Sequence, residues 1–222
     1  INDDLTPETY RKLRKFLADN GLPAEAMDGF RPWMAAMTLS MTEMMKLGAR
    51  PDLGVDNYFE SKAVMDVKPV RGLETVDFQI GIFADLEKAI QEEMLLSTLR
   101  EMATIEEDFP KMVEAWRSGD EKALGAIILD SMKTFPELRK DVLDRRNQRW
   151  VKQISAFIKE DKTFMVVVGA GHMVGKRGLL RLFERKGFRV ERWHGEKPEK
   201  AKKKKRFIPV GLHSAINTPR RG

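Results

Sequence analysis

One histidine stands in a glycine-rich turn, and its position favours chemistry. His172 closes the sequence Gly169-Ala170-Gly171-His172, directly after an apolar run at residues 163–168. A neutral imidazole can ligate a metal ion or take up a proton. The alternative is that this histidine only caps the start of the next helix. The chain contains no HExxH pair and no Gly-x-Ser-x-Gly elbow, so it lacks these signatures of a zinc protease or a serine triad.

The same turn also resembles a dinucleotide-binding turn. Gly169, Gly171 and Gly175 follow the apolar run, and Glu191 stands about 20 residues beyond Gly171, where a ribose-binding acid is expected. A full nucleotide fold needs several more strands after this unit, and only a charged tail follows here. We therefore rank the dinucleotide interpretation below the histidine interpretation.

The elements around His172 predict a strand–turn–helix–strand unit. Residues 163–168 are apolar and mostly β-branched, which is typical of a strand buried on both faces. A helix is expected over residues 179–186, and an alternating strand over residues 188–193. The two strands should be parallel neighbours. His172 would then lie at the rim of the sheet, where open α/β sheets bind their ligands.

The first two-thirds of the chain are predicted to be mostly helical. A long helix is expected over residues 31–47, and its methionines recur at helical spacing. Such a stripe is more often adaptable core than a ligand site, although it could also line an apolar groove for a peptide. The expected helix starts and stops are Thr6 with Pro7, Gly21, Gly48, Thr75, Gly119 with Asp120, and Gly187.

Composition narrows the class of protein. The 222 residues contain no cysteine, which excludes disulfides and thiolate metal sites, and no apolar run approaches the roughly 18 residues of a membrane span. No signal peptide is recognisable at the start. Nine of the 40 Lys and Arg and two of the 34 Asp and Glu follow His194, so the excess positive charge belongs to a tail at residues 195–222. We expect that tail to be disordered, and we expect no specific nucleic-acid partner.

Five motifs in a fixed order resemble the TraB/GumN family, which includes pheromone-shutdown proteins and the Tiki Wnt-inactivating metalloproteases. The motifs are RPWMAAMTL, LGARPDLGVDNYF, KPVRGLETVDFQI, RRNQRW and VVVGAGHMVGKRGLLRLFERKGFRVERW. The resemblance covers residues 32–193. It implies an α/β fold over residues 1–194, with a mixed sheet that carries the motif turns on one rim and is covered by many helices. It also implies a metal-dependent peptidase that uses manganese or cobalt.

The resemblance assigns a role to several residues. His172 matches the C-terminal GxxH motif, and Glu74 matches a strand-borne glutamate; both would be metal ligands and catalytic. The alternatives are that Glu74 only sits favourably at a helix start, and that Arg146 pairs with Asp56 as a structural bridge. The full assignment is catalytic for Glu74, His172, Arg146 and Asn147, and supporting for Asp56, Gly169 and Gly171.

One departure from the family pattern limits this interpretation. The family carries two GxxH motifs, and this chain contains one, so we expect N-terminal strands and the first motif to be missing. One histidine and one glutamate are fewer than the three protein ligands usual at a catalytic site. An open sheet edge would also favour a homodimer. The alternatives are a protein that sequesters a peptide without cleaving it, or an inactive truncated remnant. Bacterial relatives suggest the cell envelope.

Overall fold

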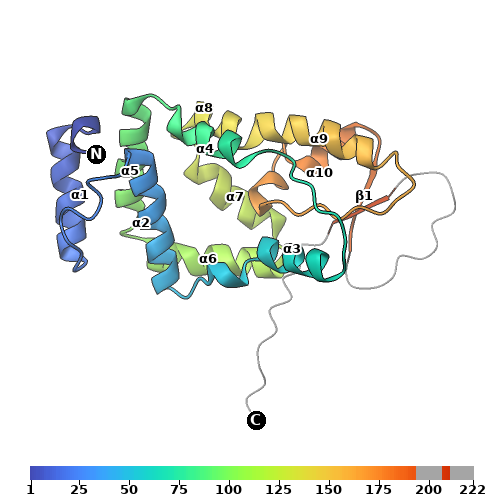
Figure 1. Cartoon of the computed structure of the whole chain (residues 1–222), viewed down its shortest axis with the longest axis horizontal. Helices are drawn as coiled ribbons and strands as arrows, with labels where there is room; N and C mark the ends of the chain where they lie inside the picture. Colours follow the sequence, from blue (N-terminus) through green and yellow to red (C-terminus); the bar gives the residue numbers. More distant parts are fainter. Residues whose placement is uncertain (194–206, 211–222) are drawn as a thin grey trace, which may run out of the picture. The chain divides into compact units, whose positions relative to one another are not determined.

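The computed structural model describes residues 1–193 and 207–210, and it is built mainly from helices (Figure 1). The chain divides into two compact units, Ile1–Asp52 with Glu74–Lys111 and Leu53–Leu73 with Met112–Gly222. The predicted α/β fold with a mixed sheet is wrong. Within the described residues the strands are β1 (Arg189–Arg192) and β2 (Phe207–Val210), which form one two-stranded parallel sheet.

The first unit is helical and has its own core. The buried residues of its first two long helices recur three and four positions apart, which places them on one face of each helix. Its elements are η1 (Asn2–Asp4), α1 (Pro7–Asp19), α2 (Pro32–Lys46), the first two residues of η2 (Pro51–Leu53), α4 (Val76–Ala84), α5 (Lys88–Glu101) and the start of α6 (Ile105–Ser118). Its core contains Leu13, Leu17, Met27, Ala35, Ala36, Leu39 and Leu95.

The predicted helix boundaries are confirmed where side chains or glycines set them. The hydroxyl of Thr6 accepts a hydrogen bond from the backbone N–H of Thr9, and Thr75 does the same for Phe78. The carboxylate of Asp120 accepts from the backbone N–H of Ala123 at 2.9 Å. These caps satisfy N–H groups that have no partner within the helix. Gly21, Gly48, Gly119 and Gly187 follow helix ends with positive φ, which favours glycine.

The second unit contains the remaining helices and the small sheet. Helix α9 (Arg145–Phe157) buries Asn147, Trp150, Val151 and Ile154, and it lies beside α10 (Leu179–Arg185) (Figure 1). The elements are α3 (Val55–Met65), α7 (Glu121–Ser131), α8 (Pro136–Arg139), the π-helical η3 (Lys140–Asp144), α9 (Arg145–Phe157), η4 (Ala170–His172), α10 (Leu179–Arg185), β1 and β2. The core contains Trp150, Val151, Ile154, Leu179 and Phe183.

Residues 163–168 do not form the predicted buried strand. They have no regular secondary structure, and Met165 is 66% exposed. Val166 and Val168 nevertheless pack against the core of the second unit. The apolar, β-branched composition therefore indicates burial of one side correctly. It could not indicate strand pairing, because a strand exists only through hydrogen bonds to a neighbour.

The second predicted strand does exist, but its neighbour differs from the prediction. β1 lies within the predicted residues 188–193, and it pairs with β2 in parallel register. β2 belongs to the segment that we assigned to the tail; residues 195–206 and 211–222 of that segment lie outside the described residues. Arg192 of β1 donates a hydrogen bond to the carbonyl of Gly119 at 2.7 Å. No helix among the described residues is long and apolar enough to cross a membrane.

Candidate functional site

His172 ends the short helix η4 and is 6% exposed. Its backbone N–H donates to the carbonyl of Gly169 at 2.9 Å, which closes the turn. The two glycines of the GxxH motif are not required by space or by φ. A Cβ at Gly169 would meet His172 Cδ2 at 3.8 Å, and a Cβ at Gly171 would meet Ile128 at 3.4 Å, both ordinary contacts.

The glycine that the turn requires is Gly178, which sequence analysis did not single out. A Cβ there would lie 2.4 Å from the carbonyl oxygen of Val174 and 2.5 Å from that of Met173. Gly175 has φ +78°, so it also favours glycine. The chain therefore makes its close backbone approach after His172, just before α10 begins.

Asn147 holds the turn that carries His172. Its side chain is 1% exposed and comes from the first turn of α9. Asn147 Nδ2 donates to the carbonyl of Arg177 at 2.9 Å and to that of His172 at 3.4 Å. Asn147 Oδ1 lies 2.7 Å from His172 Nδ1. The two carbonyl contacts fix the orientation of the amide, because only its NH₂ group can donate.

This contact selects the tautomer of His172. An amide oxygen can only accept a hydrogen bond, so Nδ1 of the neutral ring must carry the hydrogen. The lone pair of the neutral imidazole is then on Nε2, the atom that would ligate a metal or take up a proton.

Arg146 reaches the same cluster through Trp150. The Trp150 and His172 rings lie 4.3 Å apart between centroids and are tilted by 45°. The Arg146 guanidinium lies 4.7 Å from the centroid of the Trp150 ring, a cation–π contact, and Nη1 donates to the carbonyl of Val142 at 2.9 Å. Three of the predicted site residues, His172, Asn147 and Arg146, thus belong to one cluster.

Asp144 completes the cluster and was missed by sequence analysis. Its carboxylate is buried, and it accepts a hydrogen bond from Arg177 Nη1 at 2.8 Å; Arg139 Nη2 lies 3.9 Å away. Asp144 precedes Asn147 by three residues, so both lie on one face of the helix. One holds the guanidinium of Arg177 and the other holds its carbonyl. Helical spacing within Asp144-Arg145-Arg146-Asn147 was the available signal.

The other two predicted site residues, Asp56 and Glu74, come from different segments of the chain. Asp56 is exposed in the first turn of α3, a position that the helix dipole favours for an acid. Glu74 lies in a bend of the first unit, so the predicted strand around it is absent. The preceding residue, Leu73, belongs to the second unit, where its carbonyl accepts from Gln153 Nε2 at 3.1 Å.

Whether a metal ion fits at this site depends on the side chains that could ligate it. Among the described residues, no group of three or more His, Asp, Glu or Cys side chains is placed to hold a metal ion. His172 offers a suitable nitrogen, and its contacts include the amide of Asn147 and the indole of Trp150, which are poor metal ligands. The described residues therefore do not make a complete manganese or cobalt site.

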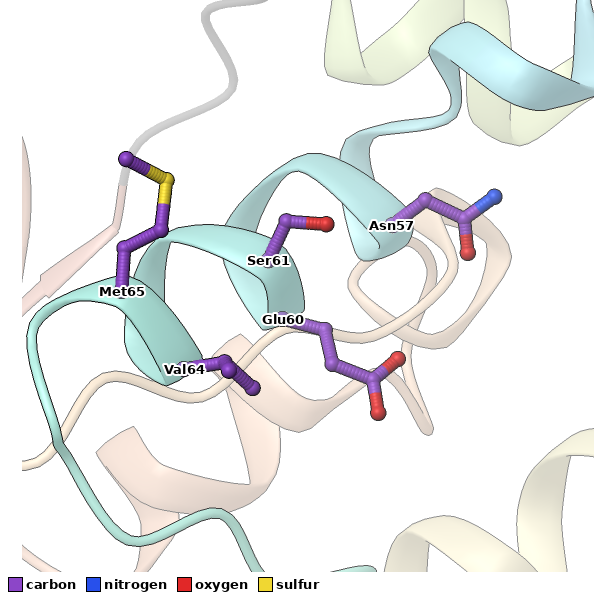
Figure 2. A pocket seen from close by; sticks show the side chains of 5 residues that line it. All are labelled: Asn57, Glu60, Ser61, Val64 and Met65. Atoms are coloured by element: carbon purple, nitrogen blue, oxygen red, sulfur yellow. The ribbon is translucent and has the colours of Figure 1, made fainter.

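The second unit also has an open hollow along α3, with a volume of about 490 Å³ (Figure 2). It is lined by Asn57, Glu60, Ser61, Val64 and Met65, which project from one helix. Val64 and Met65 are strongly exposed. None of the predicted site residues lines this hollow, and a surface formed by a single helix encloses no ligand.

Comparisons of the sequence with known proteins identify a matching family and several relatives. Residues 1–192 match the model of the TraB/PrgY/gumN family. The uncharacterized protein YbaP of Escherichia coli is 26% identical over 184 residues, which are 82% of this chain and 67% of YbaP. The human metalloprotease TIKI1 is 37% identical over 71 residues, 31% of this chain and 14% of TIKI1. A sponge TIKI homolog, from Amphimedon queenslandica, is 33% identical over 66 residues, 29% of this chain and 12% of that protein. No solved structure matches.

Proposed function

Because the chain belongs to the TraB/PrgY/gumN family, we propose that it is a metal-dependent hydrolase that acts on peptides. The partial similarity to proteins named as Tiki metalloproteases supports this proposal. The observation that carries it is the orientation of His172. Its ring is buried, its Nδ1 faces Asn147 Oδ1 at 2.7 Å, and its lone pair is on Nε2.

The residues around His172 have separate tasks in this proposal. Asn147 holds the imidazole in one tautomer and one orientation, and Asp144 holds Arg177 and with it the far end of the turn. Imidazole nitrogen is a ligand that manganese, cobalt and zinc accept. Glu74 remains a candidate donor through the family resemblance, and further donors must come from outside the His172 cluster.

The first experiment measures metal content and turnover together. The full chain is treated with a chelator, reloaded with Mn²⁺ or Co²⁺, and analysed by elemental mass spectrometry. Cleavage is measured with a pool of quenched-fluorescence peptides. We expect cleavage only after reloading, and a loss of at least about 100-fold in His172→Ala, because ligands and their oriented partners typically contribute factors of that size.

Two variants make this test specific. Glu74→Gln keeps the size of the side chain and removes its charge, so a loss of both bound metal and cleavage would support Glu74 as a donor. His213→Ala changes another histidine of the chain and serves as the control. If the His172→Ala variant binds metal and cleaves peptides as the parent does, the proposed site is wrong.

A second candidate function is peptide binding without cleavage. The observation that favours it is the donor set, since the described residues hold no group of three metal-binding side chains. Isothermal titration with the same peptide pool separates the two. Saturable binding with intact peptide recovered afterwards, with and without metal, would favour sequestration over hydrolysis.

A further inference from the structure

The segment at residues 163–168, which leads into the turn of His172, leaves its backbone unpaired. It contains no turn and no bend. Within the described part of the chain, none of its backbone N–H or C=O groups forms a hydrogen bond. Val166, Val167 and Val168 are nevertheless half-buried. Backbone groups in partly buried positions are normally paired, so this segment, here called the unpaired segment, is open to a hydrogen-bonding partner.

The unpaired segment already has the geometry of a strand. Val166 and Val168 pack against the core of the second unit, whereas Met165 is 66% exposed. Neighbouring side chains therefore point to opposite sides, which is the period of two of a strand. The ring of Phe164 stacks on Phe157 of α9, with 5.3 Å between the ring centroids. Side-chain packing thus holds the segment extended without a neighbouring strand.

No described strand of the second unit pairs with this segment. β1 lies against the same core through Val190, but its partner is β2, in the register Val190↔Ile208. The unpaired segment is therefore an edge that the chain itself leaves open within the described residues.

The spacing of the unpaired groups selects an extended polypeptide as the partner. Along a strand the backbone repeats about every 3.3 Å, and successive residues direct their N–H and C=O groups to opposite edges. A second extended backbone offers donors and acceptors at this same spacing, and a helix cannot, because its groups bond to one another. Open strand edges bind peptides in this way, as an added strand.

The side chains of the unpaired segment indicate which peptide fits. Residues 163–168 carry no charge. Phe164 and Met165 expose apolar surface, and a strand alongside would place its own side chains next to them. Apolar and β-branched side chains pair favourably across strands with such neighbours. The expected ligand is therefore an extended, uncharged peptide segment with β-branched residues.

We propose that residues 163–168 bind an extended peptide as an added strand, and that this pairing brings the peptide to the turn of His172. Gly169 follows the unpaired segment directly, and His172 ends the turn three residues later. This inference rests on the proposed function, since it takes a peptide as the substrate of the His172 site. It adds how that substrate is held: mainly through its backbone, in extended form.

The first test is hydrogen exchange of the full chain without metal, so that binding is observed without cleavage. The probe is a synthetic peptide of alternating valine and threonine with one lysine at each end. The control peptide has the same side chains but carries N-methyl groups on successive central amides, which removes donors from both edges. We expect the amides of residues 163–168 to exchange freely in the chain alone. With saturating probe they should exchange at least about tenfold more slowly, and the control peptide should give no protection.

A pair of double variants tests the edge from the side of the protein. Phe164→Pro combined with Met165→Pro removes one N–H from each edge, because successive residues point to opposite edges. Phe164→Ala combined with Met165→Ala removes the same side chains and keeps both N–H groups. By fluorescence anisotropy, we expect the proline pair to weaken probe binding at least about tenfold and the alanine pair less than about threefold. Circular dichroism checks that both variants are folded.

Four results would each overturn the proposal: protection of residues 163–168 in the chain alone, protection by the probe confined to another segment such as β1, equal protection by the N-methylated peptide, or equal losses in the two double variants. Cleavage by the metal-loaded chain is measured separately. Binding at residues 163–168 without cleavage would contradict the hydrolase and leave the docking edge standing. Cleavage without protection of these residues would contradict the docking edge alone.

Discussion

Asn147 Oδ1 lies 2.7 Å from His172 Nδ1, and the same side chain donates through Nδ2 to the carbonyls of His172 and Arg177. One buried amide therefore determines both the path of the turn and the tautomer of its histidine. The carbonyl contacts leave the amide one orientation, and that orientation presents an acceptor to the ring. The ring nitrogen of the neutral histidine that carries a lone pair is then Nε2.

The tautomer can be observed directly. Long-range ¹H–¹⁵N correlation spectra of the neutral protein should show His172 protonated on Nδ1. In Asn147→Ala this preference should disappear, and the free energy of unfolding should fall by about 1–3 kcal/mol, because buried polar groups lose their partner. The other two histidines supply reference signals in the same spectra. An Nε2-protonated His172 in the parent would contradict the assigned hydrogen bond.

The ion pair between Asp144 and Arg177 should contribute more to the free energy of unfolding than the exposed ion pairs on the surface do. Asp144 is buried and Arg177 is 57% exposed, so Arg177→Ala would leave a buried carboxylate that retains only the more distant Arg139. We expect a loss of about 1–3 kcal/mol on denaturant unfolding, reduced from the fully buried case because water reaches Arg177.

Arg181→Ala is the matched control for this pair. Its salt bridge to Glu184 is exposed on both sides, so the expected change is within about 0.5 kcal/mol. Equal losses of unfolding free energy in Arg177→Ala and Arg181→Ala would show that the ion pair between Asp144 and Arg177 stabilises the protein no more than an exposed one.

Local signals in the sequence predicted the helix ends and part of the candidate site. Thr6 and Asp120 were recognisable as caps because a side-chain acceptor acts within its own turn. His172 was named from its glycine-rich turn and Asn147 through the family resemblance, and the structure brings them together. The sheet was predicted wrongly because residues 163–168 show only strand propensity, whereas pairing depends on a distant segment. The sequence could not show that position 178 requires glycine, because the requirement arises from the nearby carbonyl groups of Met173 and Val174.

Gly178 should tolerate substitution less well than the glycines of the GxxH motif. In Gly178→Ala the new methyl would overlap the carbonyls of Met173 and Val174, so the turn must move. We expect a loss of at least about 2 kcal/mol, the range of overpacked sites. Gly169→Ala should remain within about 1 kcal/mol, because its Cβ would make only an ordinary contact with His172.

Gly29→Ala is the control for these two variants, since nothing lies within 4 Å of its Cβ position. Thermal unfolding of the three variants gives the order of their stabilities directly. A Gly178→Ala variant as stable as Gly29→Ala would mean that the close approach before α10 is absent in solution.

The stability of the first unit should depend on pH through Glu92. Burial alone would raise the pKa of this carboxyl, but hydrogen bonds from the side chains of Thr6 and Thr9 and from the backbone of Thr6 outweigh it, so the pKa lies below its usual value of 4.5. Thr6 Oγ1 donates to Glu92 Oε1 at 2.5 Å and Thr6 N donates at 3.0 Å, which joins the start of α1 to α5.

A carboxyl whose pKa is lower in the folded state stabilises the protein when it is ionised. Its contribution is therefore fully present above the unfolded pKa near 4.5, and it is lost as the pH falls from there through the lower folded pKa. Denaturant unfolding between pH 7 and pH 3 should show a smaller decline for Glu92→Gln than for the parent. Glu106→Gln, which changes an acid in the first turn of α6, is the control. Parallel pH profiles for Glu92→Gln and the parent would remove Glu92 as a source of the acid sensitivity.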